Sequence, residues 1–296
     1  MESNSPTFPP SDERLVRGES GSAPEYLRPE PGFNLPPEVR RPRPTWAYAP
    51  ATYALVAINC LVFLVMTVRG VNPMGPTSEQ LLHFGADHAG AVLQYGEWWR
   101  IVTAMFVHVG IIHLATNMWC LWNLGLLAEP LMGSAGVLAV YILTGAAGNL
   151  LSTLYNWLYP IRDVVGGIGF PVGAGASGAV FGIAGALIVL LKSHRLPVPP
   201  LELHKLRRSV IYFAAINLLI GFTISLGVVE RHTGVSIDNS AHLGGVLCGL
   251  LFAAPMVPRI GASRGLFFVR LRMAIAMVVG LLVLFGFYLV HVPRPN

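Results

Sequence analysis

The sequence is poor in charged residues. Of its 296 residues only 12% are Asp, Glu, Lys or Arg, whereas 53% are hydrophobic. In an average soluble domain roughly a quarter of the residues are charged. This composition excludes an ordinary soluble domain, and a soluble hydrolase is excluded further because Ala179 breaks the GxSxG motif around Ser177.

Several chemical signatures are also missing. The three cysteines (Cys60, Cys120 and Cys248) lie inside apolar segments at unrelated spacings, which is typical of small core residues and gives neither a disulfide framework nor a metal site. We find no nucleotide or nucleic-acid motif and expect no cofactor. The net charge of +5 does not indicate nucleic-acid binding, because most lysines and arginines lie between apolar segments.

Two other classes of membrane protein are disfavoured because the sequence lacks the motifs and acidic residues that they require. A metalloprotease could use His108, His113 and His242, but the sequence has no HExxH-like motif and no carboxylate inside the apolar segments except Glu129 at the end of the second. An ion-coupled transporter is expected to carry acidic residues at mid-membrane and to show internal repeats, and neither is found.

Apolar segments of about membrane-spanning length recur along the chain. They predict an all-α, polytopic membrane helical bundle. We place seven spans at 51–68, 111–131, 135–156, 177–192, 208–228, 239–257 and 273–291.

Three parts of the chain are predicted. Residues 1–49 are rich in proline, lack the apolar region of a signal peptide, and are expected to form a disordered cytoplasmic tail. Residues 50–258 hold six spans, and 259–296 form a basic linker with a seventh. With the N-terminus in the cytoplasm and the C-terminus outside, about 15 of the 20 lysines and arginines face inward, as the positive-inside rule requires.

This topology places polar groups from three spans at one depth. Spans two, four and six all run from the outer face inward, and near their starts lie His113 with Asn117, Ser177, and His242. His113 and Asn117 are four residues apart and share one helix face. A buried hydroxyl beside an imidazole indicates a nucleophile with its general base.

The surrounding sequence favours close approach of the serine and the histidine. Span four is short, so the loop before it (166–175) is expected to dip into the membrane beside a cavity. The pairs Gly178/Gly182 and Gly245/Gly249 have the small-xxx-small spacing that lets helix backbones approach.

From Thr52 to Pro258 the chain resembles the rhomboid intramembrane serine proteases. The resemblance rests on an ordered set of motifs: Phe84-Gly85-Ala86, Gly96-Glu97-Trp98-Trp99-Arg100, Phe106-Val107-His108, His113-xxx-Asn117-Met118, Gly175 to Gly182, and Ala241-His242-Leu243-Gly244-Gly245. It implies a rhomboid-like fold of six helices plus one. No catalytic position departs from the family pattern.

The resemblance also implies roles for individual residues. Ser177 resembles the nucleophile and His242 the general base, while His113 and Asn117 resemble the oxyanion hole. Supporting positions are the aromatic residue that packs on the base, the glycines beside the serine, and the signature of the first loop: Phe181, Gly175, Gly178, Trp99 and Arg100. The implied partners are single-span or polytopic membrane-protein substrates that enter from the bilayer between spans two and five, and the implied location is the plasma membrane.

Some alternatives stay open on the sequence. A catalytically inactive rhomboid-like binding or quality-control protein is the second hypothesis, although such relatives usually lack the serine or the histidine. His108 is either a buried structural residue of the loop or a residue near the site. Asp238 is interpreted as an exposed helix start rather than a partner of His242, and Glu129 as an interfacial residue.

Overall fold

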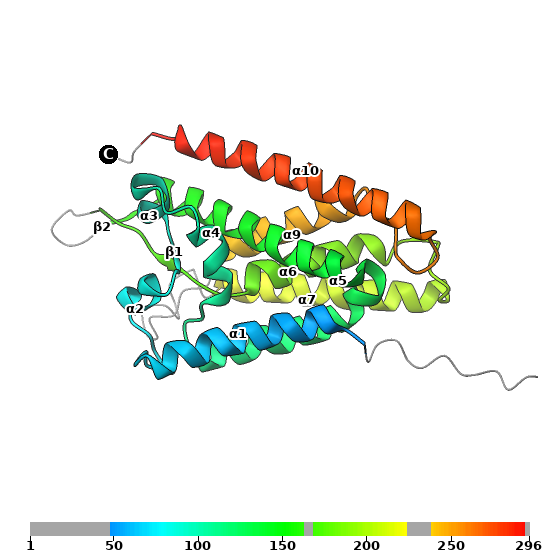
Figure 1. The fold of residues 1–296 in the computed structure, drawn as a ribbon, viewed down its shortest axis with the longest axis horizontal. Helices are drawn as coiled ribbons and strands as arrows, with labels where there is room; N and C mark the ends of the chain where they lie inside the picture. Colours follow the sequence, from blue (N-terminus) through cyan, green and yellow to red (C-terminus); the bar gives the residue numbers. More distant parts are fainter. Residues whose placement is uncertain (1–47, 163–167, 224–237, 294–296) are drawn as a thin grey trace, which may run out of the picture. The chain divides into compact units, whose positions relative to one another are not determined.

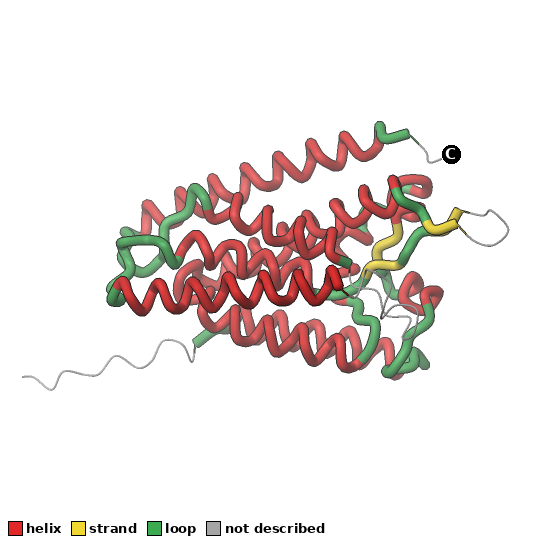
Figure 2. The backbone as a smooth tube through the Cα atoms, turned by 180° about the vertical axis from the view of Figure 1, so that it is seen from behind, coloured by secondary structure: helices red, strands yellow, loops and turns green. Residues whose placement is uncertain are grey.

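The computed structural model describes residues 48–162, 168–223 and 238–293. The expected tail therefore lies almost entirely outside the described residues, as does part of the fifth predicted span. The described chain is a bundle of helices with a few two-residue strands gathered at one end of the helices (Figure 1, Figure 2). The prediction of an all-α membrane helical bundle is confirmed.

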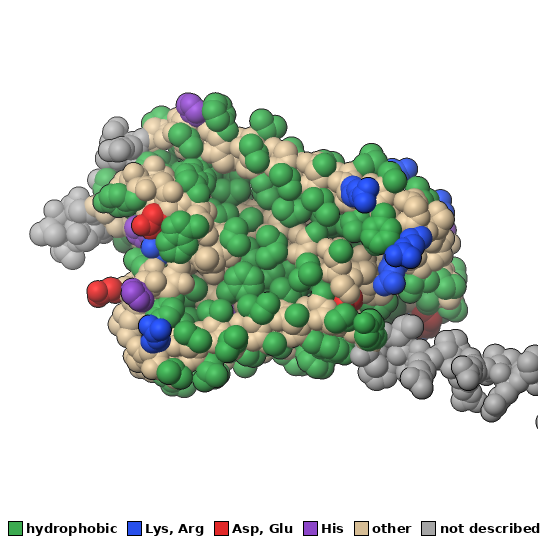
Figure 3. Space-filling view, in the orientation of Figure 1, with side chains coloured by type: hydrophobic (Ala, Val, Ile, Leu, Met, Phe, Trp, Pro, Cys, Tyr) green, Lys and Arg blue, Asp and Glu red, His purple; other side chains and the backbone are tan. Residues whose placement is uncertain are grey.

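The long helices follow the predicted spans. The helices of the bundle are α1 (Pro50–Val68), α5 (Ile111–Leu158), α6 (Ser177–Leu190), α7 (Pro200–Thr223), α9 (Asn239–Ala253) and α10 (Arg264–Val290). Within the described residues, α1, α5 and α10 are long and apolar enough to cross a bilayer, and α6 and α9 are apolar but shorter. Hydrophobic side chains cover much of one face, and Lys and Arg gather mainly toward one end (Figure 3).

Helix α5 contains the second and third predicted spans. Gly133 has non-helical backbone angles (φ 67°, ψ 166°) and divides the element between the two predicted segments. The second half returns to the end where the first half starts: His113 lies beside Gly175, and Gly148 lies beside the carbonyl of Ala241. Both halves of α5 therefore reach the end of the bundle where Ser177 and His242 lie.

Two predicted helix starts need correction, and the contacts of Glu129, which is expected to be interfacial, are now defined. Glu129 is 3% exposed, and its carboxylate accepts the backbone N–H groups of Ala51 and Thr52, each at 2.9 Å. It thereby satisfies the free N–H groups at the start of α1, whose own N-cap residue makes no side-chain bond. Helix α7 begins at Pro200, eight residues before the predicted span, and the seventh helix begins at Arg264, nine residues before its predicted start. Ser263 caps the seventh helix, and helices tolerate arginines whose charged ends reach the interface.

The first loop (residues 69–110) is itself structured. It contains α2 (Ser78–His83), β1 (Asp87–His88), α3 (Ala89–Tyr95), α4 (Arg100–Thr103) and the 3-10 helix η4 (Ala104–Phe106). Strand β1 pairs antiparallel with β4 (Val172–Gly173), while β2 (Ile161–Arg162) pairs with β3 (Ile168–Gly169). The first loop is thus hydrogen-bonded to the segment that leads into Ser177.

Candidate active site

Ser177 is the first residue of α6, as predicted, and the chain before it is held in place. Gly175 has φ 137°, a conformation that favours glycine, and its N–H donates to the Ala104 carbonyl at 3.0 Å. The hydroxyl therefore lies at a helix N-terminus, where backbone N–H groups lack intrahelical acceptors and the helix dipole favours negative charge.

Ala176, the residue between Gly175 and Ser177, is held by His108. The Ala176 N–H donates to Nε2 of His108 at 3.4 Å, and Nδ1 lies 3.3 Å from the Phe106 carbonyl oxygen. The ring is fully buried, and its burial, aided by neighbouring His113, lowers the pKa of His108 to about 3. His108 is therefore a neutral structural residue that also adjoins the site, which combines the two alternatives left open on the sequence.

Helices α6 and α9 approach each other as the glycine spacing predicts. A Cβ atom at Gly245 would lie 2.0 Å from the carbonyl oxygen of Gly178, and one at Gly249 would lie 2.0 Å from that of Gly182. Of the two glycine pairs, the pair on α9 is the one that this close approach requires. The position of a Cβ at Gly178 is 3.3 Å from the nearest atom of α9, while one at Gly182 would instead collide with Thr144 of α5.

The imidazole of His242 lies in the first turns of α9. Its ring stacks on Phe181, with ring centroids 4.4 Å apart and an interplanar angle of 21°, so the expected aromatic contact is present. His242 is 8% exposed, and its Nδ1 has no hydrogen-bond partner among the described residues. Phe181 also faces Phe213 of α7 at 6.1 Å.

The predicted oxyanion residues lie on the first half of α5. His113 packs against the bend before the serine, since a Cβ atom at Gly175 would lie 2.5 Å from its Cε1. Asn117 is 6% exposed, and its side-chain amide donates to the His113 carbonyl at 2.9 Å. An amide nitrogen has two hydrogens, so a second donor remains for a ligand.

All four residues line one cavity of about 520 Å³. Ser177, His242, His113 and Asn117 reach it from α6, α9 and α5, and α7 contributes Phe213. In the described parts of the chain Ser177 makes no hydrogen bond to the imidazole. Hydrogen bonds between catalytic groups are often long or poorly aligned when no substrate is bound.

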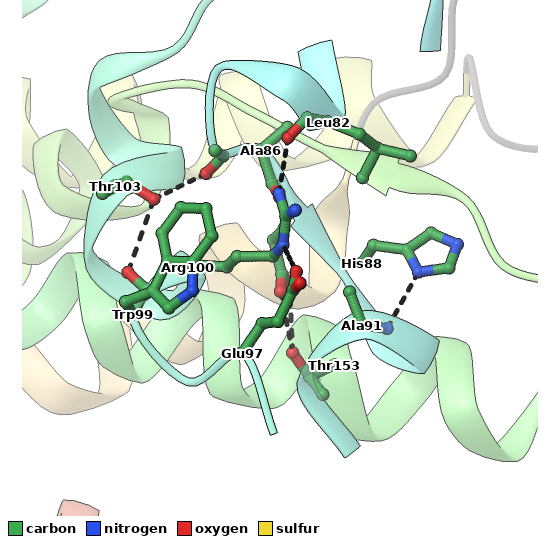
Figure 4. A network of polar contacts seen from close by, with 11 residues as sticks. Leu82, Ala86, His88, Ala91, Glu97, Trp99, Arg100, Thr103 and Thr153 are labelled. Carbon is green, nitrogen blue, oxygen red and sulfur yellow. Dashed lines mark hydrogen bonds and ion pairs between the residues drawn. The ribbon is translucent and has the colours of Figure 1, made fainter. Parts of the chain in front are cut away.

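Trp99 and Arg100 lie away from this cavity and organise the first loop (Figure 4). The Arg100 guanidinium donates to the carbonyls of Leu82 (2.7 Å) and Ala86 (3.0 Å) and pairs with Glu97 at 2.5 Å. It also lies 4.5 Å from the centre of the Trp99 ring. These contacts fix the backbone around β1, the strand that pairs with the segment before Ser177.

Two carboxylates adjoin these residues: sequence reasoning missed Asp87 and interpreted Asp238, which lines the cavity, as a helix start. Asp87 of β1 is 2% exposed, and its Oδ2 accepts a hydrogen bond from the Thr153 hydroxyl at 3.1 Å. Burial raises the pKa of Asp87 to about 7. Asp238 is only partly exposed and is bonded by Ser152, the neighbour of Thr153. The signal in the sequence is weak, because each residue resembles an ordinary loop or cap position.

Metal chemistry receives no support from the side-chain arrangement. Within the described residues, no group of three or more His, Cys, Asp or Glu side chains is placed to hold a metal ion. His108 and His113 do lie near one another, with ring centroids 5.4 Å apart. The first of them is occupied by the backbone contacts described above.

Comparison with known proteins identifies the class that this fold and site suggest. The model of the Rhomboid domain matches residues 95–259. The chain is 34% identical to "Rhomboid protease GluP" of Bacillus subtilis (strain 168) over 244 residues, covering 82% of this chain and 41% of that protein. It is 33% identical to "RHOMBOID-like protein 6, mitochondrial" of Arabidopsis thaliana over 193 residues, covering 64% of this chain and 55% of that protein.

A further relative is matched over more of its own length. The chain is 29% identical to "Rhomboid protease AarA" of Providencia stuartii over 206 residues, or 68% of this chain and 70% of that protein. Because the domain model covers more than half of the sequence, the chain belongs to the rhomboid family. It spans about half the length of the first curated relatives it matches.

Proposed function

We propose that this chain is an intramembrane serine endopeptidase that hydrolyses peptide bonds in or near transmembrane segments of other membrane proteins. One observation carries the proposal: Ser177, His242, His113 and Asn117 line the same cavity within a bundle of membrane helices. Family membership supports it, since the Rhomboid domain spans residues 95–259, which hold all four residues, and two of the relatives are named as proteases.

In the proposed reaction Ser177 is the nucleophile and His242 the general base. The imidazole accepts the hydroxyl proton while Oγ forms a bond to the carbonyl carbon of the substrate, and the carbonyl electron pair moves onto its oxygen. Collapse of this intermediate breaks the C–N bond, and the imidazolium returns the proton to the leaving amine. Water then attacks the acyl-enzyme by the same route and regenerates the serine.

The negative oxygen needs donors that are already in place. The backbone N–H of Ser177 at the start of α6, the Asn117 amide and the His113 ring are suited to this role. Each such donor typically lowers the barrier by about 2.7–4 kcal/mol. The contact of His113 with Gly175 supports this assignment, because it fixes the ring beside the turn that carries the serine.

The substrate must be an unwound segment of a membrane protein. Peptide bonds inside a helix are shielded by its own hydrogen bonds, so small or helix-breaking residues near the scissile bond favour cleavage. We propose that substrates enter from the bilayer between the first half of α5 and α7, which form spans two and five. Thr116 and Cys120 on α5 and Phe213 and Asn217 on α7 line the cavity on these two sides.

The same proposal includes an orientation in the membrane. The N-terminus lies in the cytoplasm, the C-terminus outside, and cleavage occurs near the outer face of the plasma membrane. The distribution of charge supports it: lysines and arginines follow α6 and begin α7 and α10, at the helix ends away from Ser177 and His242.

Cleavage by purified protein in liposomes tests the function. The substrate is a fluorogenic single-span polypeptide with Gly and Ala in the outer half of its membrane segment. We expect wild type to cleave it, and Ser177→Ala and His242→Ala to bind it without cleavage. Cleavage that persists in Ser177→Ala contradicts the mechanism. Binding without cleavage by wild type favours an inactive rhomboid-like binding protein instead.

A further inference from the structure

Asp238, which precedes α9, is held more extensively than a helix cap requires. Its Oδ1 accepts the Ala241 N–H at 3.0 Å, which is the bond of an N-cap, and also accepts the Ser240 hydroxyl at 2.5 Å. Its Oδ2 accepts a further hydrogen bond from Ser152 on the second half of α5. One carboxylate thus joins the start of α9 to a different helix.

The α5 partner is itself fixed. Ser152 is 1% exposed, and its hydroxyl oxygen accepts a hydrogen bond from Asn156 at 3.2 Å. Helix α9 also packs tightly on α5 here, because a Cβ atom at Gly148 would lie 2.6 Å from the Ala241 carbonyl oxygen. The carboxylate of Asp238 is therefore held at a defined place relative to both helices.

This place adjoins the proposed base. The carbonyl of Asp238 accepts the N–H of His242 at 3.2 Å, so the carboxylate lies one helical turn before the imidazole, and both residues line the cavity. Two other titratable groups lie in the region: His113, which also lines the cavity, and Asp87 on β1, because a Cβ atom at Gly173 would lie 3.6 Å from both Asp238 Oδ2 and Asp87 Cβ. A carboxylate fixed near an imidazole stabilises the positive charge that proton transfer creates.

We infer that Asp238 is a positioning residue for His242: held by Ser152 and Ser240, its carboxylate sets the first turn of α9 and supplies negative charge to the imidazolium. This inference rests on the proposed function, in which His242 is the base. Asp238 is thus a third group beside the dyad of Ser177 and His242, which works without direct contact with an acid. Asp238 acts through the base and does not touch the substrate.

A purely structural cap predicts a different outcome, which makes the inference testable. Asn caps helices about as well as Asp does, but it carries no charge. Asp238→Asn therefore keeps the cap and removes the charge, whereas Asp238→Ala removes both. Glu202→Gln is the matched control, because it neutralises a carboxylate that is 53% exposed and pairs with Lys205 on α7.

The experiment measures kcat, KM and the unfolding midpoint of all four proteins in liposomes or mixed micelles, with the single-span substrate described above. We expect Asp238→Asn to unfold at the wild-type midpoint but to lose about tenfold or more in kcat at unchanged KM, the pattern of a group that acts in the transition state. Asp238→Ala loses the same activity and also stability, and Glu202→Gln behaves as wild type.

A second variant tests the link to α5. Ser152→Ala frees Oδ2 and is expected to lower kcat, and its effect is smaller when Asp238→Asn is already present, because both changes act through one contact. Wild-type kcat in Asp238→Asn overturns the inference and leaves the protease assignment intact. A wild-type protein that cleaves nothing overturns the proposed function, and the inference with it.

Discussion

Replacing Gly245 with alanine tests whether the contact between α6 and α9 sets the geometry of the proposed dyad. The added methyl carbon would lie 2.0 Å from the Gly178 carbonyl oxygen and 2.8 Å from its carbon. Real contacts of a Cβ atom essentially never fall below 3.0 Å. Both obstacles are backbone atoms, so no side-chain rotation relieves the clash.

The required movement can be worked out from these distances. The helices must separate locally by about 1 Å, the difference between 3.0 and 2.0 Å. Gly178 follows Ser177 directly, and Gly245 is less than one turn from His242, so the separation acts on the reacting pair. A misplacement of about 1 Å typically lowers the rate about 100-fold. Overpacking is expected to destabilise the protein by about 1–3 kcal/mol.

A graded series of glycine substitutions separates local geometry from loss of folding. Gly185→Ala places its methyl 2.5 Å from the Val246 carbonyl oxygen, and Gly178→Ala places one 3.3 Å from that of Ala241. Activity is expected to fall most in Gly245→Ala and least in Gly178→Ala. Gly280→Ala in α10 is the matched control, because its methyl meets nothing within 4 Å.

The assay is kcat for the single-span substrate, with the unfolding midpoint of each variant recorded in the same micelles. Gly280→Ala should keep full activity and gain slightly in stability, since alanine favours a helix over glycine by about 0.8–1.0 kcal/mol. Full activity in a folded Gly245→Ala protein would show that the dyad does not depend on this contact.

Three further predictions concern the surroundings of the cavity. Gly175→Ala strains the backbone at φ 137° and places a methyl 2.5 Å from the His113 ring. It should lower kcat about 100-fold with little change in KM, as loss of an oxyanion donor does. A variant with unchanged kcat and a raised KM would contradict this. Arg100→Lys should reduce the unfolding free energy by about 3 kcal/mol in an SDS titration, because lysine cannot reproduce the two carbonyl bonds and the pair with Glu97. Burial raises the pKa of Asp87 from 3.8 to about 7, so the folded state binds this proton more tightly, and wild-type stability should fall relative to Asp87→Asn as pH rises from about 4 to about 7. Parallel unfolding midpoints of these two proteins across that range would show that the carboxyl does not titrate there.

The sequence predicted the parts of this protein that depend on hydrophobic length and glycine spacing. A span must be about 20 apolar residues long, and α1 and α5 follow the predicted limits closely. The start of α6 at Ser177 and the close approach at Gly245 were also predictable, because few residues other than glycine permit that contact.

Long-range polar contacts could not be predicted in the same way. The hydrogen bonds of Glu129 could not be predicted, because no neighbouring residue indicates that its partner is the N-terminus of α1, 78 residues earlier. Asp238 has the local signature of a helix cap, and its bond to Ser152 spans 86 residues. One sequence taken alone contains no signal for such pairs, and only the folded chain brings them together.

The most direct test of the central claim is to locate the adduct of a fluorophosphonate probe on the purified protein by peptide mass spectrometry. With Ser177 as nucleophile and His242 as its base, we expect a single adduct on Ser177 in wild type, none in Ser177→Ala, and strongly reduced labelling in His242→Ala. An adduct on another residue, or labelling of Ser177 that does not change when His242 is replaced, would contradict this assignment.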